Sequence, residues 1–465
     1  MSRRISGCYR QGVGALPSFP AGFRFGVATS AFQIEGATGA DGRGESIWDR
    51  FCDEPGNVRN GDTGLVACDH YRRYEDDLDL IVGLGLDSYR FSIAWPRVVP
   101  TGSGPVNQRG LDHYRRLVDA MRERGLRPLA TLYHWDLPQP LEEVGGWISR
   151  ETAERFAEYA AIVFDALGDC VDDWVTQNEP WVTAVEGYAQ GKKAPGLTDW
   201  PASLAASHHL LLSHGLAVQA FDATRGDGGR IGITLNLTPM LPAGDGAADV
   251  AAARRADGFH NRWYLDPVLA GAYPADMLGF YESRGVDFRF IVDGDAAVIG
   301  APTDFLGVNY YSVGRVTELG DANFLGLEFE RASAPVTAMG WEIAPDHLEQ
   351  LLVRLDAEYR RPRILITENG AAFDDVMMNG HVYDIDRVRF LEEHLAAAAR
   401  AISAGADVEA YYLWSLLDNF EWESGYRPRF GIVHVDYETQ RRTPKQSALW
   451  YRDFVCSQRV DQRAA

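Results

Sequence analysis

Two glutamates, Glu179 and Glu368, each end a short apolar run, in Thr176-Gln-Asn-Glu-Pro180 and Ile366-Thr-Glu-Asn369. Breaking an acetal needs a proton on the leaving oxygen and stabilisation of an oxocarbenium-like centre. Two carboxyl groups about 5 Å apart supply both in a retaining mechanism. A single glutamate at a strand end is more often a residue that points from the core into solvent and has no catalytic role. The neighbours of the two glutamates therefore decide between the two interpretations.

The neighbours expected around the two glutamates favour unequal protonation. Arg90 and Tyr311 also lie in or just after apolar runs and are predicted in the same region. A cation and a phenol beside Glu368 would keep it ionised while Glu179 stays protonated. Pro180 restrains the backbone directly after Glu179.

The remaining polar and aromatic residues at the ends of these runs suit recognition of a sugar. Hydrogen bonds to hydroxyls could come from four side chains, and flat apolar faces for the C–H side of a pyranose from two tryptophans: Gln33, His134, Asn178 and Asn309, with Trp414 and Trp422. Alone, a histidine or tryptophan in such a place is more often a core residue. Together they indicate a carbohydrate site.

Eight short apolar or aromatic runs recur along the chain and are predicted as strands. They cover Phe23–Ser30, Ser88–Trp95, Arg127–His134, Asp173–Asn178, Arg230–Leu237, Phe305–Tyr311, Ile364–Glu368 and Glu409–Ser415. Helical periodicity follows several of them, over Leu111–Arg124, Glu151–Leu167, His347–Tyr359 and Asp386–Ser403, with Gly125, Gly168 and Gly405 as C-terminal caps.

Eight βα units without a break in composition predict an α/β fold, a single (β/α)8 TIM barrel, because parallel strands need helical crossovers and eight strands close around a side-chain core. The chemistry of such barrels lies at the carboxyl ends of the strands. An open doubly wound sheet is the alternative. The segment Gly187–Lys193 has one residue too few between its glycines and no Ser or Thr after the lysine, so it fails as a phosphate loop and no cofactor is expected.

Composition excludes several classes of protein. The chain has 465 residues with a formal charge of −21, which disfavours nucleic acid and anionic membrane surfaces as partners. No apolar stretch is long enough for a membrane span. Five dispersed cysteines, without a C-x-x-C pair, favour a reduced, cytoplasmic protein, and His208, His209 and His214 lack metal-ligand spacing. Residues 1–18 are predicted as a flexible tail and residues 19–465 as the barrel.

The chain resembles glycoside hydrolase family 1, of the bacterial β-glucosidase type, from about Phe19 to Phe454. The resemblance rests on seven motifs: Phe25-GVATSAFQIE-Gly36, Tyr89-RFSIAWP-Arg97, Thr131-LYHWDL-Pro138, Thr176-QNE-Pro180, Leu306-GVNY-Tyr311, Ile366-TEN-Gly370 and Trp414-SLLDNFE-Trp422. It implies that Glu179 is the acid/base and Glu368 the nucleophile, with Arg90, Tyr311 and Asn309 near Glu368.

The same resemblance implies which residues hold the sugar and what the sugar is. They are Gln33, His134, Trp135, Asn178, Asn309, Glu421 and Trp422, with Trp414 as the platform. An acidic residue at position 421 would repel a phosphate, so an unphosphorylated β-glycoside is expected. Trp181, Val182 and Trp341 are candidates for the aglycone wall.

Three questions stay open at this stage. A binding protein on the same fold and a transglycosidase are the competing functions, since fold alone does not fix function. The residues do not decide between glucose, galactose and fucose. A homo-oligomer is also compatible with the sequence.

Overall fold

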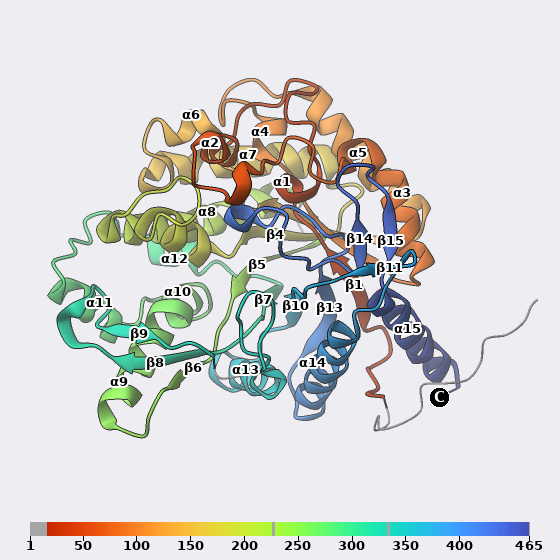
Figure 1. Ribbon diagram of the computed structural model, residues 1–465. Coiled ribbons are helices and arrows are strands. Elements are labelled where there is room, and N and C mark those ends of the chain that lie inside the picture. The colour runs from red at the N-terminus through yellow and green to blue at the C-terminus, as the bar shows by residue number, and fades with distance from the viewer. Residues whose placement is uncertain (1–15, 226–227, 333–334, 465) are drawn as a thin grey trace, which may run out of the picture.

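The computed structural model describes residues 16–225, 228–332 and 335–464, and its centre is a closed barrel of eight parallel strands (Figure 1). Around the barrel the order of the strands is β1-β13-β10-β7-β5-β4-β3-β2. Their bounds are β1 (Arg24–Ala28), β2 (Ser88–Ser92), β3 (Arg127–Tyr133), β4 (Asp173–Asn178), β5 (Arg230–Asn236), β7 (Phe305–Asn309), β10 (Ile364–Asn369) and β13 (Val408–Trp414). The predicted (β/α)8 barrel is confirmed.

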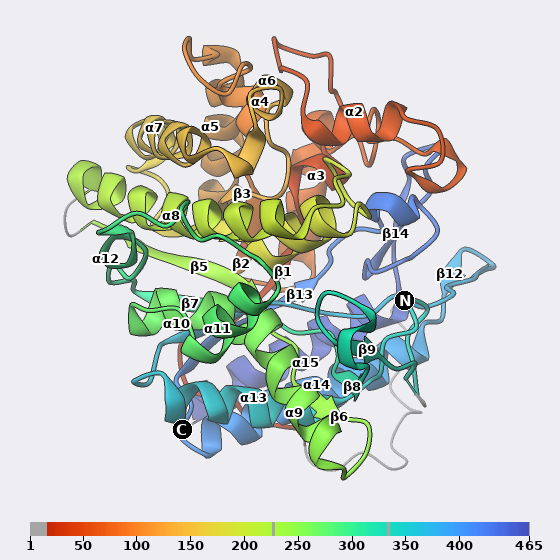
Figure 2. The ribbon, with the colours of Figure 1, turned by 90° about the vertical axis from the view of Figure 1, so that its left-hand side faces the viewer.

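Helices surround the strands (Figure 1). The long ones are α3 (His70–Gly83), α5 (Gln108–Glu123), α7 (Arg150–Leu167), α8 (Trp200–Arg225), α13 (Pro345–Glu358), α14 (Ile385–Ser403) and α15 (Gln446–Ala464). The shorter ones are α1 (Ala31–Ile34), α2 (Ile47–Asp53), α4 (Trp95–Val98), α6 (Gln139–Glu142), α9 (Ala247–Asp257), α10 (Trp263–Ala270), α11 (Ala275–Ser283) and α12 (Asp295–Ile299). Helices α7 and α8 pack side by side (Figure 2).

The glycines predicted as helix caps behave in two ways. Gly125 and Gly405 follow α5 and α14 with φ of 74° and 112°, a conformation that favours glycine. Gly168 ends α7 with φ of −65°, which other residues also adopt.

Several predicted strands extend too far at their carboxyl ends. The runs expected to end at Ser30, Trp95 and Tyr311 stop as strands at Ala28, Ser92 and Asn309. Isolated ladder bonds continue beyond all three ends, since the N–H groups of Thr29, Ile93 and Tyr310 donate to the backbone carbonyls of Arg90, Thr131 and Glu368. Apolar residues persist there because the loops after the strands are themselves buried under the mouth of the barrel.

Three small sheets were missed by the sequence analysis. They are β6 (Met240–Pro242), β8 (Gly314–Glu318) and β9 (Leu327–Phe329); β11 (Met377–Met378) with β12 (His381–Val382); and β14 (Val433–Val435) with β15 (Arg442–Pro444). The first packs on α9, away from the central strands (Figure 1). Six of these seven strands have only two or three residues, which is too short for a period-two pattern to stand out.

The inside of the barrel is filled by side chains that alternate with outward ones. Ala28, Leu129, Val175, Phe305, Leu365, Ala410 and Tyr412 form one buried cluster. Tyr412 requires a glycine opposite it, because a Cβ on Gly26 would lie 2.7 Å from the Tyr412 ring. The barrel is therefore a packed core that can hold the strand ends in fixed positions.

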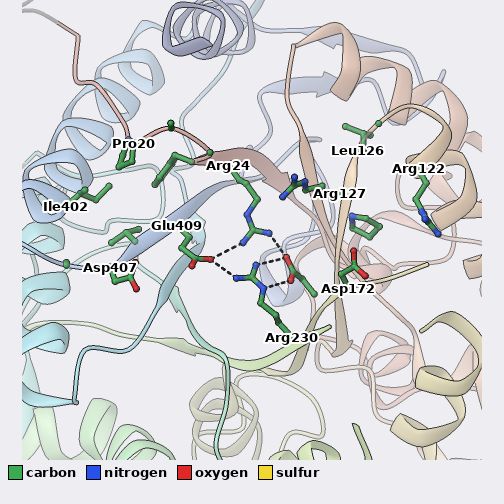
Figure 3. A pocket seen from close by; sticks show the side chains of 18 of the residues that line it. Pro20, Arg24, Arg122, Leu126, Arg127, Asp172, Arg230, Ile402, Asp407 and Glu409 are labelled. Carbon is green, nitrogen blue, oxygen red and sulfur yellow. Dashed lines mark hydrogen bonds and ion pairs between the residues drawn. The ribbon is translucent and has the colours of Figure 1, made fainter. Parts of the chain in front are cut away.

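The amino-terminal end of the barrel carries a neutralised ion network. Arg24 and Arg230 both pair with Asp173, and Arg230 also pairs with Glu409 at 2.7 Å. These residues line a cavity of about 860 Å³, where Figure 3 shows the guanidinium groups of Arg24 and Arg230 facing the Glu409 carboxylate. Since the charges compensate one another and lie opposite the carboxyl ends of the strands, this network serves stability.

The chain ends and the membrane prediction complete the description. Phe19 is buried against Phe23, Phe25 and Phe454. Most of the predicted tail, residues 1–15, lies outside the described residues. Among the described helices none is both long and apolar enough to cross a membrane.

Replacing Asp173 by Asn should lower the free energy of unfolding by about 3–5 kcal/mol, because Arg24 and Arg230 lose a buried counter-charge. Burial raises the pKa of Asp173, but the two arginines outweigh this and hold it below its ordinary value. A depressed folded-state pKa contributes stability that is lost as pH falls through that pKa. In denaturant unfolding, the difference in free energy of unfolding between Asp173→Asn and wild type should therefore become smaller as the pH is lowered. Glu409→Gln, at a more exposed carboxylate, should lose about 1 kcal/mol or less; equal losses in both variants would contradict this account.

Candidate active site

The site residues predicted from the sequence lie together at the carboxyl end of the barrel. Arg90 lies in β2, and the last two residues of four strands include Asn178, Asn309, Glu368 and Trp414. His134, Trp135, Glu179 and Tyr311 directly follow strands, Gln33 lies in α1, and Glu421 and Trp422 lie in the loop after β13. Tyr311 and Glu421 are half-buried, and the other residues of this set are buried. Hydrogen bonds, ring contacts and charge interactions connect them.

Glu368 is held by a cation and a phenol. Arg90 Nη1 donates to Glu368 Oε1 at 2.5 Å, and the Tyr311 hydroxyl donates to Glu368 Oε2 at 2.5 Å. Burial raises the pKa of Glu368, and Arg90 and Tyr311 oppose that rise. Both oxygens therefore receive donors that favour the carboxylate form.

Glu179 has a different environment. Its Oε1 accepts a hydrogen bond from the Asn309 amide at 2.6 Å. Burial, followed by the charge of Glu368, raises the pKa of Glu179 to about 8. Of the two glutamates, Glu179 is the one that holds a proton at neutral pH, because a neutral amide compensates burial less than a guanidinium does.

A chain of amide and imidazole groups leads away from Arg90. Asn178 Oδ1 accepts from Arg90 Nη2 at 2.6 Å, so its amide nitrogen faces His134 Nε2 at 3.2 Å. Burial and Arg90 lower the pKa of His134 well below its ordinary value, so the ring is neutral. With Nε2 accepting, the proton lies on Nδ1, which is buried and lacks a partner among the described residues. His134 Nδ1 is thus available to donate to a ligand hydroxyl.

Gln33 fastens the loop that carries Glu421. Its Nε2 donates to Asn419 Oδ1 at 3.0 Å and to the Phe420 carbonyl at 2.8 Å, and its Oε1 accepts from Ser30 at 2.6 Å. Both amide hydrogens of Gln33 are used within the protein. Only acceptor capacity on Oε1 remains for a ligand.

Indole rings form the apolar part of the site. Trp422 packs on Trp135 at 4.6 Å and on Trp48 at 4.5 Å between ring centroids. Trp414 and Trp422 both lie nearly parallel to the His134 ring, at interplanar angles of 19° and 17°. Flat faces beside hydroxyl-binding groups suit a pyranose ring.

Glu421 is half-buried, and one of its carboxylate oxygens is unpaired in the described part of the chain. Its Oε2 is buried and has no hydrogen-bond partner among the described residues. The pKa of Glu421 is raised to about 8: burial is the largest cause, Glu423 and Glu368 act in the same direction, and Lys193 opposes the rise. A buried, unsatisfied acceptor costs free energy that hydroxyl donors of a ligand would relieve.

Two charged residues of this region were missed by the sequence analysis. Lys193 Nζ lies 2.6 Å from Glu423 Oε2, and Lys193 reaches this region from the loop after the π-helical turn Val182–Ala189. Glu423 directly follows the motif that ends at Trp422, and this position in the sequence could have indicated that it lies near the site. Lys193 had been assessed only as part of a phosphate loop.

The candidates for the aglycone wall lie outside the polar groups. Trp341 packs on Tyr311 at 5.4 Å between centroids, and Trp181 packs on His260 at 4.1 Å. Val182 is buried beside Trp181. Trp341 is therefore the candidate that touches a residue contacting Glu368.

The three histidines of α8 have partners of their own. His208 Nε2 faces Asp295 at 2.9 Å, His209 faces the Trp147 carbonyl at 3.0 Å, and His214 faces Thr176 at 2.7 Å. The acidic partner of His208, Asp295, lies 87 residues away in the sequence. The His208 and His209 rings also contact each other, at 5.5 Å between centroids.

Comparison with known sequences agrees with this geometry. The model of glycosyl hydrolase family 1 matches residues 16–460. Beta-glucosidase A of Acetivibrio thermocellus is 48% identical over 446 residues, which cover 94% of this chain and 98% of that protein. A bifunctional beta-D-glucosidase/beta-D-fucosidase of Bifidobacterium breve is 46% identical over 459 residues, covering 94% and 98%.

Solved structures match equally well. The family 1 β-glucosidase from Thermotoga maritima superposes with a TM-score of 0.92 at 45% identity, covering 96% of this chain and 99% of that one. The same enzyme in complex with isofagomine lactam gives 0.91 at 45% identity, covering 95% and 99%. This chain belongs to glycosyl hydrolase family 1.

Proposed function

We propose that this chain is a retaining β-glucosidase that removes terminal non-reducing β-D-glucosyl residues from unphosphorylated O-glycosides and short oligosaccharides. The observation that carries the proposal is the unequal setting of two buried carboxyls: Glu368 receives a guanidinium and a phenol, and Glu179 receives an amide. Such a pair separates a nucleophile from an acid. Family membership and relatives named β-glucosidases support the substrate class.

The proposed reaction is a double displacement. Glu368 attacks the anomeric carbon while Glu179 gives its proton to the departing oxygen, so that a covalent glycosyl-enzyme forms and the aglycone leaves as an alcohol. Glu179 then takes a proton from water, whose oxygen attacks the anomeric carbon and releases Glu368. Two inversions retain the configuration, and the reaction needs no metal or cofactor.

The sugar would be bound by the surrounding groups. Hydrogen bonds would come from Gln33, His134, Asn178, Asn309 and Glu421, and apolar contact from Trp135, Trp414 and Trp422. The ionised form of Glu421 would repel a phosphate, which supports unphosphorylated substrates. Fucosides and galactosides are proposed as further substrates. One relative is named for both glucosidase and fucosidase activity, which supports the fucosides.

Two broader properties remain part of the proposal. The catalytic unit would begin near Phe19, whose ring packs on Phe454 from the last helix. A reducing compartment such as the cytoplasm is supported by Cys52, Cys68, Cys170 and Cys456, which are free thiols.

Replacing Glu368 by Gly should lower kcat for 4-nitrophenyl β-D-glucoside by a factor of about 10⁴ or more, because the glycosyl-enzyme cannot form. Azide or formate should restore part of the activity and yield an α-glycosyl product, detectable by NMR. Arg90 would lose its counter-charge, so folding should be checked by thermal unfolding. A folded variant without rescue would argue against Glu368 as nucleophile.

Replacing Glu179 by Gln should affect substrates according to their leaving groups. Cellobiose needs protonation of its leaving oxygen and should lose about 10²–10⁴ in rate, whereas a 2,4-dinitrophenyl glucoside should form the glycosyl-enzyme at close to the normal rate. Pre-steady-state release of dinitrophenol measures this difference. Equal losses for both substrates would contradict the acid role.

Glycosyl transfer to alcohol at low acceptor concentration would favour a transglycosidase.

The Tyr311→Phe variant should change the pH dependence of kcat/KM. Activity requires ionised Glu368 and protonated Glu179, whose pKa of about 8 sets the alkaline limb. Loss of the Tyr311 donor raises the pKa of Glu368, so the acidic limb should move to higher pH while the alkaline limb moves less. An acidic limb that stays in place would mean that Tyr311 does not act on the nucleophile.

A further inference from the structure

A second group of largely buried charges connects the loops that follow β10 and β13. Three cations and three carboxylates pair with one another in it: Arg387, Arg429 and Lys445 with Asp375, Asp384 and Asp418. These six residues form what we call the loop-base cluster. Because its charges are equal in number, the cluster can be buried without a net charge.

Lys445 is the link at the centre of the loop-base cluster. It lies directly after β15, and its ammonium lies 2.5 Å from Asp375 and 2.7 Å from Asp418. The side chains of Lys445 and Asp418 are 0% exposed, and that of Asp375 is 2% exposed. Asp375 belongs to the loop that follows β10 and Asp418 to the loop that follows β13, and these two strands are neighbours in the barrel. One buried ammonium therefore ties the two loops together.

Asp418 is fixed through its backbone as well as its carboxylate. Its Oδ1 accepts from Lys445 and from the Gly431 N–H, at 2.7 and 3.0 Å. Its Oδ2 accepts from Arg429 at 2.8 Å, and its own N–H donates to the Val433 carbonyl at 3.0 Å. The loop after β13 is thus held at this residue by several bonds at once.

The chain continues from Asp418 directly to groups that would bind the sugar. The next two residues are Asn419 and Phe420, whose side-chain and backbone carbonyl oxygens accept from the amide of Gln33 at 3.0 and 2.8 Å. Glu421 and Trp422 then follow. A displacement of the loop at its base would therefore move a carboxylate, an indole and the partners of Gln33 together.

The segment after Glu368 is held by the same cluster. Arg387 Nε donates to the Ala371 carbonyl at 3.3 Å. At Gly370 the two loops approach so closely that a Cβ would lie 1.8 Å from the carbonyl oxygen of Trp414. The nucleophile and the loop after β13 therefore share one support.

We propose that Asp418 and Lys445 are positioning residues that set the place of the loop over residues 418–422 relative to Glu368, and so set the affinity of the site for the sugar. This rests on the proposed function, because the sugar must contact both the loop and Glu368. Asp418 and Lys445 act through the loop and do not touch the reacting atoms. Misplacement of such groups by about 1 Å can cost about 100-fold in rate.

The matched variants Asp418→Asn and Asp173→Asn test the proposal. Both remove a buried carboxylate that pairs with two cations, but Asp173 pairs with Arg24 and Arg230 at the opposite end of the barrel. Both should lower the thermal midpoint. Only Asp418→Asn should raise KM and the inhibition constant of glucose, by about tenfold, whereas Asp173→Asn should keep both within about twofold.

The measurement must count active sites, because a variant that is only less stable loses active enzyme without losing affinity. Mass spectrometry after labelling with a 2-deoxy-2-fluoroglucoside, which traps the glycosyl-enzyme, gives that count. Per active site, KM and the inhibition constant of glucose should change more than kcat in Asp418→Asn. Equal changes of the inhibition constant in Asp418→Asn and Asp173→Asn would overturn the proposal.

The double variant Lys445→Met/Asp418→Asn separates positioning from stability. It removes one charge of each sign, so the cluster stays balanced and part of the thermal midpoint lost in Asp418→Asn should return. The link between the loops stays broken, so the inhibition constant of glucose should stay raised. An inhibition constant that returns to the wild-type value together with the midpoint would contradict the proposal. If Asp418→Asn does not fold, the double variant decides by the same constant.

A failure of this inference can be told apart from a failure of the proposed function. Wild-type turnover of the β-glucoside, lost in Glu179→Gln and Glu368→Gln, tests the function by itself. An active wild type whose KM and glucose inhibition are unchanged in Asp418→Asn refutes only the role of the loop-base cluster. No turnover by folded wild type on any β-glycoside refutes both.

Discussion

The charge of Arg90 is the constraint on which the site depends. Arg90 is 1% exposed, and its guanidinium reaches from β2 to Glu368 on β10, Asn178 on β4 and Thr131 on β3. A buried cation is costly unless its donors are satisfied. Only a closed barrel brings three other strands within reach of one side chain on β2, so the closure of the fold and the ionisation of Glu368 are one requirement.

The conformation of the chain at the mouth of the barrel follows from the same requirement. Trp135, Glu179 and Trp422 have φ of 80°, 50° and 48°, which is unfavourable for residues other than glycine. Each of them directs a functional side chain from a loop that must turn sharply at a strand end or above it. The packed interior and the ion network at the opposite end of the barrel stabilise the fold and so offset the cost of these strained conformations.

Sequence patterns predicted the parts of this arrangement that depend on local order. The eight runs located all eight barrel strands, and the polar residues at their ends came together because parallel strands share an edge. The strand limits at Trp95 and Tyr311 were wrong, since burial of the following loops extends the apolar pattern. The acidic partner of His208 and the place of Lys193 depend on segments distant in sequence, which periodicity does not report.

Four carboxyl groups share the site with two cations. Glu179, Glu368, Glu421 and Glu423 lie near Arg90 and Lys193, and the pKa values of Glu179 and Glu421 are both raised to about 8, with burial as the largest cause. The proposed chemistry uses the proton on Glu179, whose hydrogen-bond partner, Asn309, is neutral. Glu421 instead has a charged neighbour, Lys193, which opposes its protonation. Burial therefore acts in the same direction on both carboxyls, and what differs is the charge of their neighbours.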